Sequence, residues 1–136
     1  MRLSRMNLLT SCVLAVTLCL FLYPSTTLGE EIVIDVAPNV INIQSQSVVV
    51  TVHTDIAYGS VDVSSVYLNG VLINSWKSDL RGNFVAKFLS DDIKMLDGLI
   101  IDSYNELKLV GDTTDRVAFS GSQEIRVIDN EPAGKE

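Results

Sequence analysis

The stretch SSVYLNGVLIN, residues 64–74, predicts a β-hairpin. Asn69 and Gly70 separate two runs in which apolar side chains alternate with others. A two-residue hairpin turn needs positive φ at both central positions, and Asn and Gly adopt that conformation at the lowest cost. The register of such a hairpin pairs Leu68 with Val71. This turn therefore commits the middle of the chain to antiparallel strands.

Strand patterns recur on both sides of this hairpin. β-branched residues dominate 47–54, where Val48, Val50 and Val52 are expected on one face, and residues 83–88 alternate as a half-buried strand does. Turns are expected at 111–115 and 120–122. About seven short strands with almost no helix indicate an all-β fold, an antiparallel β-sandwich. The remaining predicted strands are 31–36, 105–110, 116–119 and 123–129.

One segment, 90–98, has helical character. Ser90 or Asp91 is a suitable N-cap, acidic residues suit the first turn, and Gly98 suits the end of the helix. The segment is one or two turns long, so we expect a helical connector between strands.

The first 29 residues have the features of a secretory signal peptide. Arg2 and Arg5 precede an apolar run from Leu8 to about Tyr23, and a small polar segment follows it. A retained membrane anchor is the alternative, since the run approaches the spanning minimum of roughly 17 residues. Cleavage would leave a sandwich domain at 30–130 and a flexible tail at 131–136, secreted or periplasmic. The domain would contain no cysteine, because both cysteines precede it.

Charge limits the partners of the mature chain. Without Arg2 and Arg5, 8 basic residues oppose 17 acidic ones, so the net charge is −9. Nucleic acid and anionic membrane surfaces are therefore poor partners.

The sequence offers no assembled catalytic motif. His53 is the one histidine in the chain, and its strand position predicts the wetter face of the sheet. A serine relay needs a histidine beside the nucleophile, and no G-x-S-x-G motif is present. The adjacent Asp91 and Asp92 are explained by helix capping. We therefore expect a non-enzymatic protein with no cofactor and no metal.

Four motifs in order carry a resemblance: IDVAPNVINIQSQS, VDVSSVYLNGV, VAKF and FSGSQEIRVID. Together they resemble the secreted immunoglobulin-like sandwich modules of bacterial and archaeal surface and cell-envelope proteins. The resemblance spans Ile32 to Asp129 and implies an immunoglobulin-like β-sandwich.

In that family an aspartate-rich D-x-D-x-D-G loop precedes a Lys-Phe pair, here Lys87-Phe88. The resemblance sets Ser75, Lys77, Asp79 and Asn83 where the family has aspartates, and Leu80 at its glycine. Calcium needs six to eight oxygen ligands with carboxylates among them. We therefore interpret the segment as a degenerate calcium-type loop in which Lys77 pairs with Asp79. A weak surviving site and an ordinary polar turn are the alternatives.

Two classes of function remain open. The first is an exported module with a structural or binding role toward a protein or glycan of the cell envelope. Tyr58 and Trp76, in loop-like surroundings, are the candidate contacts, although core packing is the competing role for Trp76. The second is an accessory or inhibitory subunit of an exported enzyme.

Overall fold

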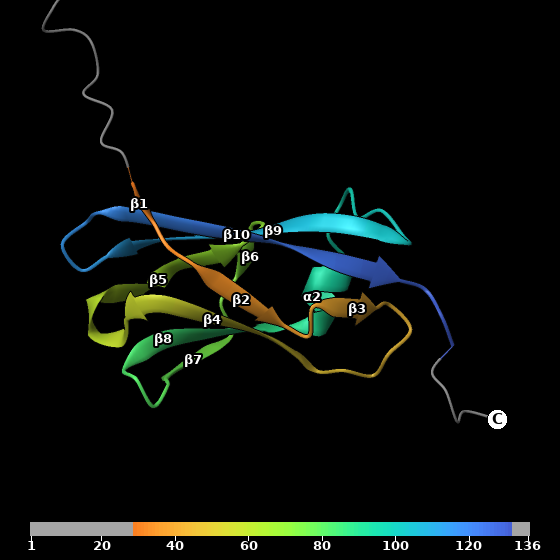
Figure 1. Ribbon diagram of the computed structural model, residues 1–136, viewed down its shortest axis with the longest axis horizontal. Helices are drawn as coiled ribbons and strands as arrows, with labels where there is room; N and C mark the ends of the chain where they lie inside the picture. The colour runs from red at the N-terminus through yellow and green to blue at the C-terminus, as the bar shows by residue number, and fades with distance from the viewer. Residues whose placement is uncertain (1–28, 132–136) are drawn as a thin grey trace, which may run out of the picture.

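The computed structural model describes residues 29–131, which form two packed β-sheets (Figure 1). This confirms the predicted all-β sandwich. The strands are β1 (Glu30–Glu31), β2 (Ile34–Ala37), β3 (Val40–Asn42), β4 (Val49–Ala57), β5 (Val61–Leu68), β6 (Val71–Leu72), β7 (Ser75–Ser78), β8 (Asn83–Leu89), β9 (Ser103–Thr113) and β10 (Ala118–Ile128). A 3₁₀ turn, η1 (Tyr58–Ser60), and a short helix, α2 (Ser90–Lys94), complete the described fold.

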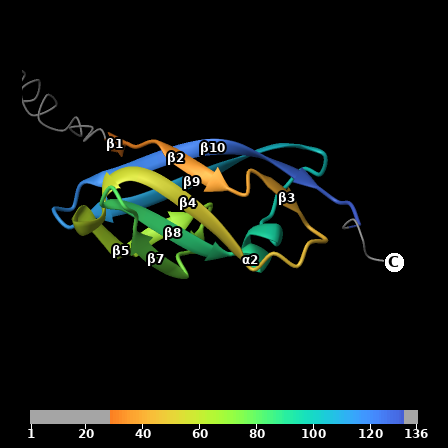
Figure 2. The ribbon, with the colours of Figure 1, turned by 60° about the horizontal axis from the view of Figure 1, so that its bottom comes forward.

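The smaller sheet has the strand order β2-β4-β8-β7, with every pair antiparallel. The larger sheet has the order β1-β10-β9-β5-β6, and β3 also pairs with β10. Its central pairs are antiparallel, whereas β1 and β3 both run parallel to β10. The chain therefore passes from the larger sheet to the smaller sheet through β2 and returns through β3 (Figure 2).

The Asn69-Gly70 hairpin forms as the sequence predicts. Asn69 has φ 47° and Gly70 has φ 85°, and Leu68 pairs with Val71 across the turn. Leu68 is fully buried, so the hairpin presents its predicted apolar face to the core.

The core lies between the two sheets and follows the predicted alternation on β8. Phe84, Ala86 and Phe88 are fully buried in the main hydrophobic cluster. Val85 is also fully buried although its side chain belongs to the opposite face of the strand. On β4, Val50 and Val52 are buried. Val48 was expected on the same face, but it precedes the strand and is 69% exposed.

The last strand differs from the prediction. Two strands with a turn at 120–122 were expected, but β10 runs unbroken from Ala118 to Ile128. Gly121 lies inside this strand, where an added Cβ would sit 2.6 Å from the Ile32 carbonyl oxygen. The glycine therefore allows the N-terminal segment to cross closely over β10. The described chain has more strands than predicted because β3 and β7 were not expected and the predicted strand 31–36 is divided into β1 and β2.

The helical connector is present but is shorter than expected and capped differently. Leu89 occupies the N-cap position without a side-chain hydrogen bond. Ser90, a predicted cap, is buried, and its hydroxyl has no hydrogen-bond partner among residues 29–131. Ser90 is already the first helical residue, so its side chain lies one position too late to cap the helix.

The described chain begins and ends at opposite ends of the long axis (Figure 1). The predicted signal segment and the predicted tail fall outside the described residues, except for Gly29 and Glu131. Within 29–131, no helix is long and apolar enough to cross a membrane.

Candidate functional site

The β7–β8 connection contains the loop that the sequence marks as calcium-like. The Asp79 carboxylate oxygen Oδ1 accepts hydrogen bonds from the backbone amides of Arg81, at 2.8 Å, and Asn83, at 2.9 Å. The Asp79 amide donates to the Asn83 carbonyl oxygen at 2.9 Å, and the Gly82 amide donates to the Asp79 carbonyl oxygen at 3.1 Å. One aspartate therefore closes the turn from both its side chain and its backbone.

These contacts also determine the ionisation of Asp79. The backbone amide of Asn83 is the main cause of a pKa below the ordinary value of 3.8, and the amide and charge of Arg81 act in the same direction. Desolvation opposes them, raising the pKa by a smaller amount. Amide donors favour the charged form, so the loop holds Asp79 as a carboxylate.

The four residues of the calcium-type loop do not share one location. Ser75 and Lys77 lie on β7, where they pair with Lys87 and Val85 of β8. Asp79 and Asn83 bracket the turn itself. Leu80 is at the exposed tip of the loop. Within residues 29–131, no three histidine, cysteine or acidic side chains form a group suited to a metal ion.

The expected ion pair between Lys77 and Asp79 is absent from the described chain, where the salt bridge within 4.0 Å joins Lys94 to Asp91. This prediction was wrong because the Asp79 carboxylate is turned into its own loop, where two backbone amides bind it. The amides therefore supply the positive partner that we had assigned to the ammonium group.

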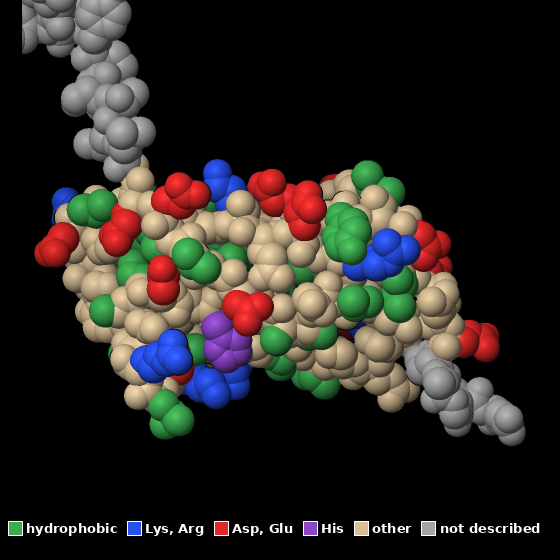
Figure 3. All heavy atoms as spheres, viewed as in Figure 1, with side chains coloured by type: hydrophobic (Ala, Val, Ile, Leu, Met, Phe, Trp, Pro, Cys, Tyr) green, Lys and Arg blue, Asp and Glu red, His purple; other side chains and the backbone are tan. Residues whose placement is uncertain are grey.

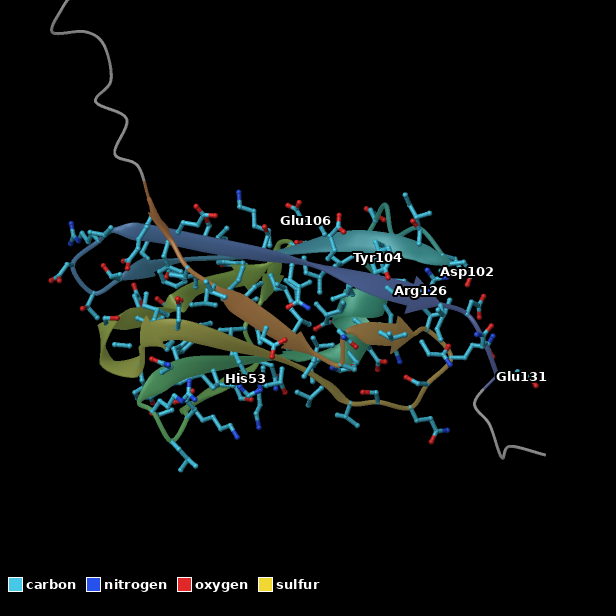
Figure 4. The ribbon with its side chains drawn as sticks, in the orientation of Figure 1. His53, Asp102, Tyr104, Glu106, Arg126 and Glu131 are labelled. Carbon is cyan, nitrogen blue, oxygen red and sulfur yellow. The ribbon has the colours of Figure 1, made fainter. Side chains whose placement is uncertain are left out.

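A shallow groove of about 430 Å³ lies beside this loop on the outer face of the smaller sheet. His53 is exposed there, as predicted, and pairs across the strands with Asp35 on one side and Val85 on the other. Figure 4 labels His53 on this face, and Figure 3 shows acidic and basic side chains next to the histidine. The full lining is Val33, Ile34, Asp35, His53, Thr54, Asp55, Asp79, Leu80, Arg81 and Asn83.

Two of the three carboxylates in the groove hold backbone segments. Asp79 closes the β7–β8 turn, and Asp55 Oδ1 accepts a hydrogen bond from the Val33 amide at 2.9 Å. The Asp55 amide in turn donates to the Val33 carbonyl oxygen at 3.3 Å. These carboxylates fix the local structure of the groove, which is open to solvent along the sheet.

The two predicted contact aromatics lie near the same hairpin. Tyr58 is in η1, as the loop-like sequence suggested, and its ring lies 6.3 Å from the Phe84 ring. Its amide donates to the Gly82 carbonyl oxygen at 2.9 Å, which ties η1 to the β7–β8 loop. Trp76 lies on β7, not in a loop, and pairs with Ala86 of β8. The indole is 43% exposed, because β7 is an edge strand.

Sequence reasoning missed a second exposed group, on the connection from α2 to β9. Met95, Ile100 and Ile101 are 80%, 61% and 40% exposed. We had interpreted this segment as the end of a connector. The available signal was its composition, since large apolar residues flank Asp97-Gly98 in a segment that a polar loop would normally occupy.

Comparisons of the chain with protein-family models, with curated proteins and with solved structures gave no match.

Proposed function

We propose that the chain is an exported, non-catalytic β-sandwich module with a structural or binding role at the cell envelope or outside the cell. The strand order supports the immunoglobulin-like resemblance. Order β2-β4-β8-β7 in one sheet and β10-β9-β5-β6 in the other corresponds to A-B-E-D opposite G-F-C-C′ of immunoglobulin domains.

The half-exposed Trp76 on the edge strand β7 carries the binding part of this proposal. An edge strand has unpaired backbone groups that an extended segment can add to, and an exposed indole offers a large contact area beside them. Tyr58 adds a second aromatic side chain, 39% exposed, at η1 beside the same hairpin.

A pull-down with the exported, C-terminally tagged protein tests the proposal in the envelope fraction of its own organism. We expect the wild-type protein to retain a specific protein or glycan and Trp76→Ala to lose it. Tyr67→Ala is the matched control, because Tyr67 is a similarly exposed aromatic, at 38%, on the other sheet.

Equal retention by wild type and Trp76→Ala would contradict the role of the β7 edge. Turnover of a captured substrate by the purified protein would contradict the non-catalytic assignment. Retention of an exported hydrolase would identify the protein as an accessory or inhibitory subunit instead.

A further inference from the structure

Four large apolar side chains are exposed within ten residues, on the connection from α2 into β9. Met95 is 80%, Ile100 61%, Ile101 40% and Tyr104 62% exposed. We refer to these four side chains as the 95–104 surface. Single exposed apolar residues are normal, whereas contiguous exposed apolar patches mark interaction sites.

Other residues, of α2 and of the same connection, supply the core contacts of this part of the chain. Ile93 is fully buried, and Leu96 and Leu99 pack against the main hydrophobic cluster. The exposed side chains are therefore not needed to anchor the connection to the sandwich.

The Asn105 side chain holds the backbone at Ile100, within the 95–104 surface. Asn105 Oδ1 accepts a hydrogen bond from the Ile100 amide at 2.8 Å, and Asn105 Nδ2 donates to the Ile100 carbonyl oxygen at 3.0 Å. The Asp102 amide donates to the Val127 carbonyl oxygen at 2.7 Å, which ties the connection to β10. A surface fixed before binding loses less conformational entropy when a partner docks.

Tyr104 has a partner on the neighbouring strand. It pairs with Arg126 of β10, whose guanidinium carbon lies 5.8 Å from the centre of the Tyr104 ring. Figure 4 shows Asp102, Tyr104 and Arg126 together at the end of the larger sheet, and Figure 3 shows hydrophobic side chains around a basic one there. Tyrosine, arginine and methionine are enriched at the centres of protein interfaces.

Carboxylates border this surface. Asp97 and Asp102 are exposed on the same connection, Asp92 is exposed on α2, and Asp91 of α2 has a 4.0 Å contact with Lys94. A partner that fits must therefore cover an apolar centre and bring positive charge to its rim.

We propose that the 95–104 surface is a docking site for a protein partner with an aliphatic patch bordered by Lys and Arg. This inference rests on the proposed binding role, and it adds a second surface and a partner chemistry. It uses the α2–β9 connection, whereas the proposed function uses the β7 edge.

Two fluorescent amphipathic helical peptides of equal length test this complementarity, one of leucine and lysine and one of leucine and glutamate. Anisotropy titration with the purified exported protein should show binding of the leucine–lysine peptide and much weaker binding of the leucine–glutamate peptide. Ile100→Ser and Asp97→Asn should each weaken the first interaction by about tenfold.

The matched controls are Leu80→Ser and Asp115→Asn, which remove an exposed leucine and an exposed carboxylate outside the α2–β9 connection. They should leave binding unchanged. Both pairs of variants should keep the wild-type melting temperature, since all four side chains are exposed.

Four results would overturn the inference. If Asp115→Asn weakened binding as much as Asp97→Asn does, the peptide would sense only net charge, and equal weakening by Leu80→Ser and Ile100→Ser would mean that binding is not confined to the 95–104 surface. Sedimentation that shows a dimer lost in Ile100→Ser would assign the surface to a second copy. Binding to uncharged phosphatidylcholine vesicles, lost in Ile100→Ser, would assign it to a lipid surface. If Trp76→Ala retained the partner in the pull-down while the leucine–lysine peptide still bound selectively, only the proposed role of the β7 edge would be contradicted.

Discussion

Asn69 contributes more to the hairpin than its tolerance of positive φ. Its Nδ2 donates to the Glu106 carbonyl oxygen at 2.9 Å, and its Oδ1 accepts from the Lys108 amide at 2.7 Å. The side chain thus extends the pairing of β5 with β9 past the end of β5. Glycine would keep the turn conformation and remove both bonds.

We expect Asn69→Gly to lower the free energy of unfolding in urea by about 1–2 kcal/mol more than a control glycine substitution does. Asn74→Gly is that control, because Asn74 is exposed and its side chain makes no hydrogen bond in the described chain. Equal losses in the two variants would show that the Asn69 side chain adds nothing beyond the turn.

Asp79 makes stability depend on pH in a predictable direction. Its folded-state pKa is below 3.8, mainly because the Asn83 amide binds the carboxylate, so ionised Asp79 stabilises the fold above that pH. This contribution is lost as the pH falls below 3.8 through the folded-state value. Asp79→Asn keeps an oxygen acceptor and removes the titration.

The difference in unfolding free energy between wild type and Asp79→Asn should therefore be largest at neutral pH and shrink in acid. Urea titrations at pH values from neutral to below 3.8 measure this difference. Asp35→Asn is the control, because Asp35 is an exposed aspartate on the same sheet. If the difference in unfolding free energy between wild type and Asp79→Asn stayed constant to the lowest pH measured, the role assigned to the Asp79 carboxylate would be contradicted.

At the scale of elements, the fold depends on a close crossing of the N-terminal segment over β10. The Ile32 amide donates to the Ser120 carbonyl oxygen at 2.9 Å. A Cβ at Gly121 would lie 2.6 Å from the Ile32 carbonyl oxygen and 2.9 Å from Ile34 Cγ2. The crossing therefore has no room for a side chain at this position.

Gly121→Ala should cost about 1–3 kcal/mol of unfolding free energy, because the N-terminal segment must move outward. Gly59→Ala is the matched control, since nothing lies within 4 Å of a Cβ at Gly59. Urea denaturation measures both. If Gly121→Ala were as stable as Gly59→Ala, the N-terminal segment would not pack as closely on β10 as the structure has it.

Elements with local signals were predictable, whereas those fixed by distant partners were not. Asn69-Gly70 specifies its turn through the backbone preferences of two residues, and the alternation on β8 specifies its buried face. β7 carries no strand pattern of its own and forms by pairing with β8. Gly121 was interpreted as a turn residue. It lies inside a strand because Ile32, which is distant in sequence, passes too close to it for a side chain.

The candidate site shows the same limit. The polar turn at Asp79 was visible in the sequence, but the direction of its carboxylate depends on the backbone of the folded loop. Exposure of Ile100 could not be separated from core packing, because Leu96 and Leu99 on the same segment do pack on the core.

At the scale of the whole molecule, our account describes a sandwich with one core between its two sheets and a β7–β8 loop that is closed by hydrogen bonds of its own. The β7–β8 hairpin closes through Asp79 and the amides of Arg81 and Asn83. Trp76 and the 95–104 surface are the two contact regions that we propose on this sandwich. We propose as the central claim that these backbone amides do what a cation would do in the calcium-type loop that the sequence resembles.

Thermal melting of the purified exported protein with about 10 mM calcium, compared with chelator, tests this claim most directly, because calcium at ten times Kd would add about 1.4 kcal/mol. Lys77→Asp, which restores a carboxylate, is measured alongside. We predict the same melting temperature with calcium and with chelator for both proteins. A wild-type protein that melts several degrees higher with calcium would contradict the account and show that the folded protein binds calcium.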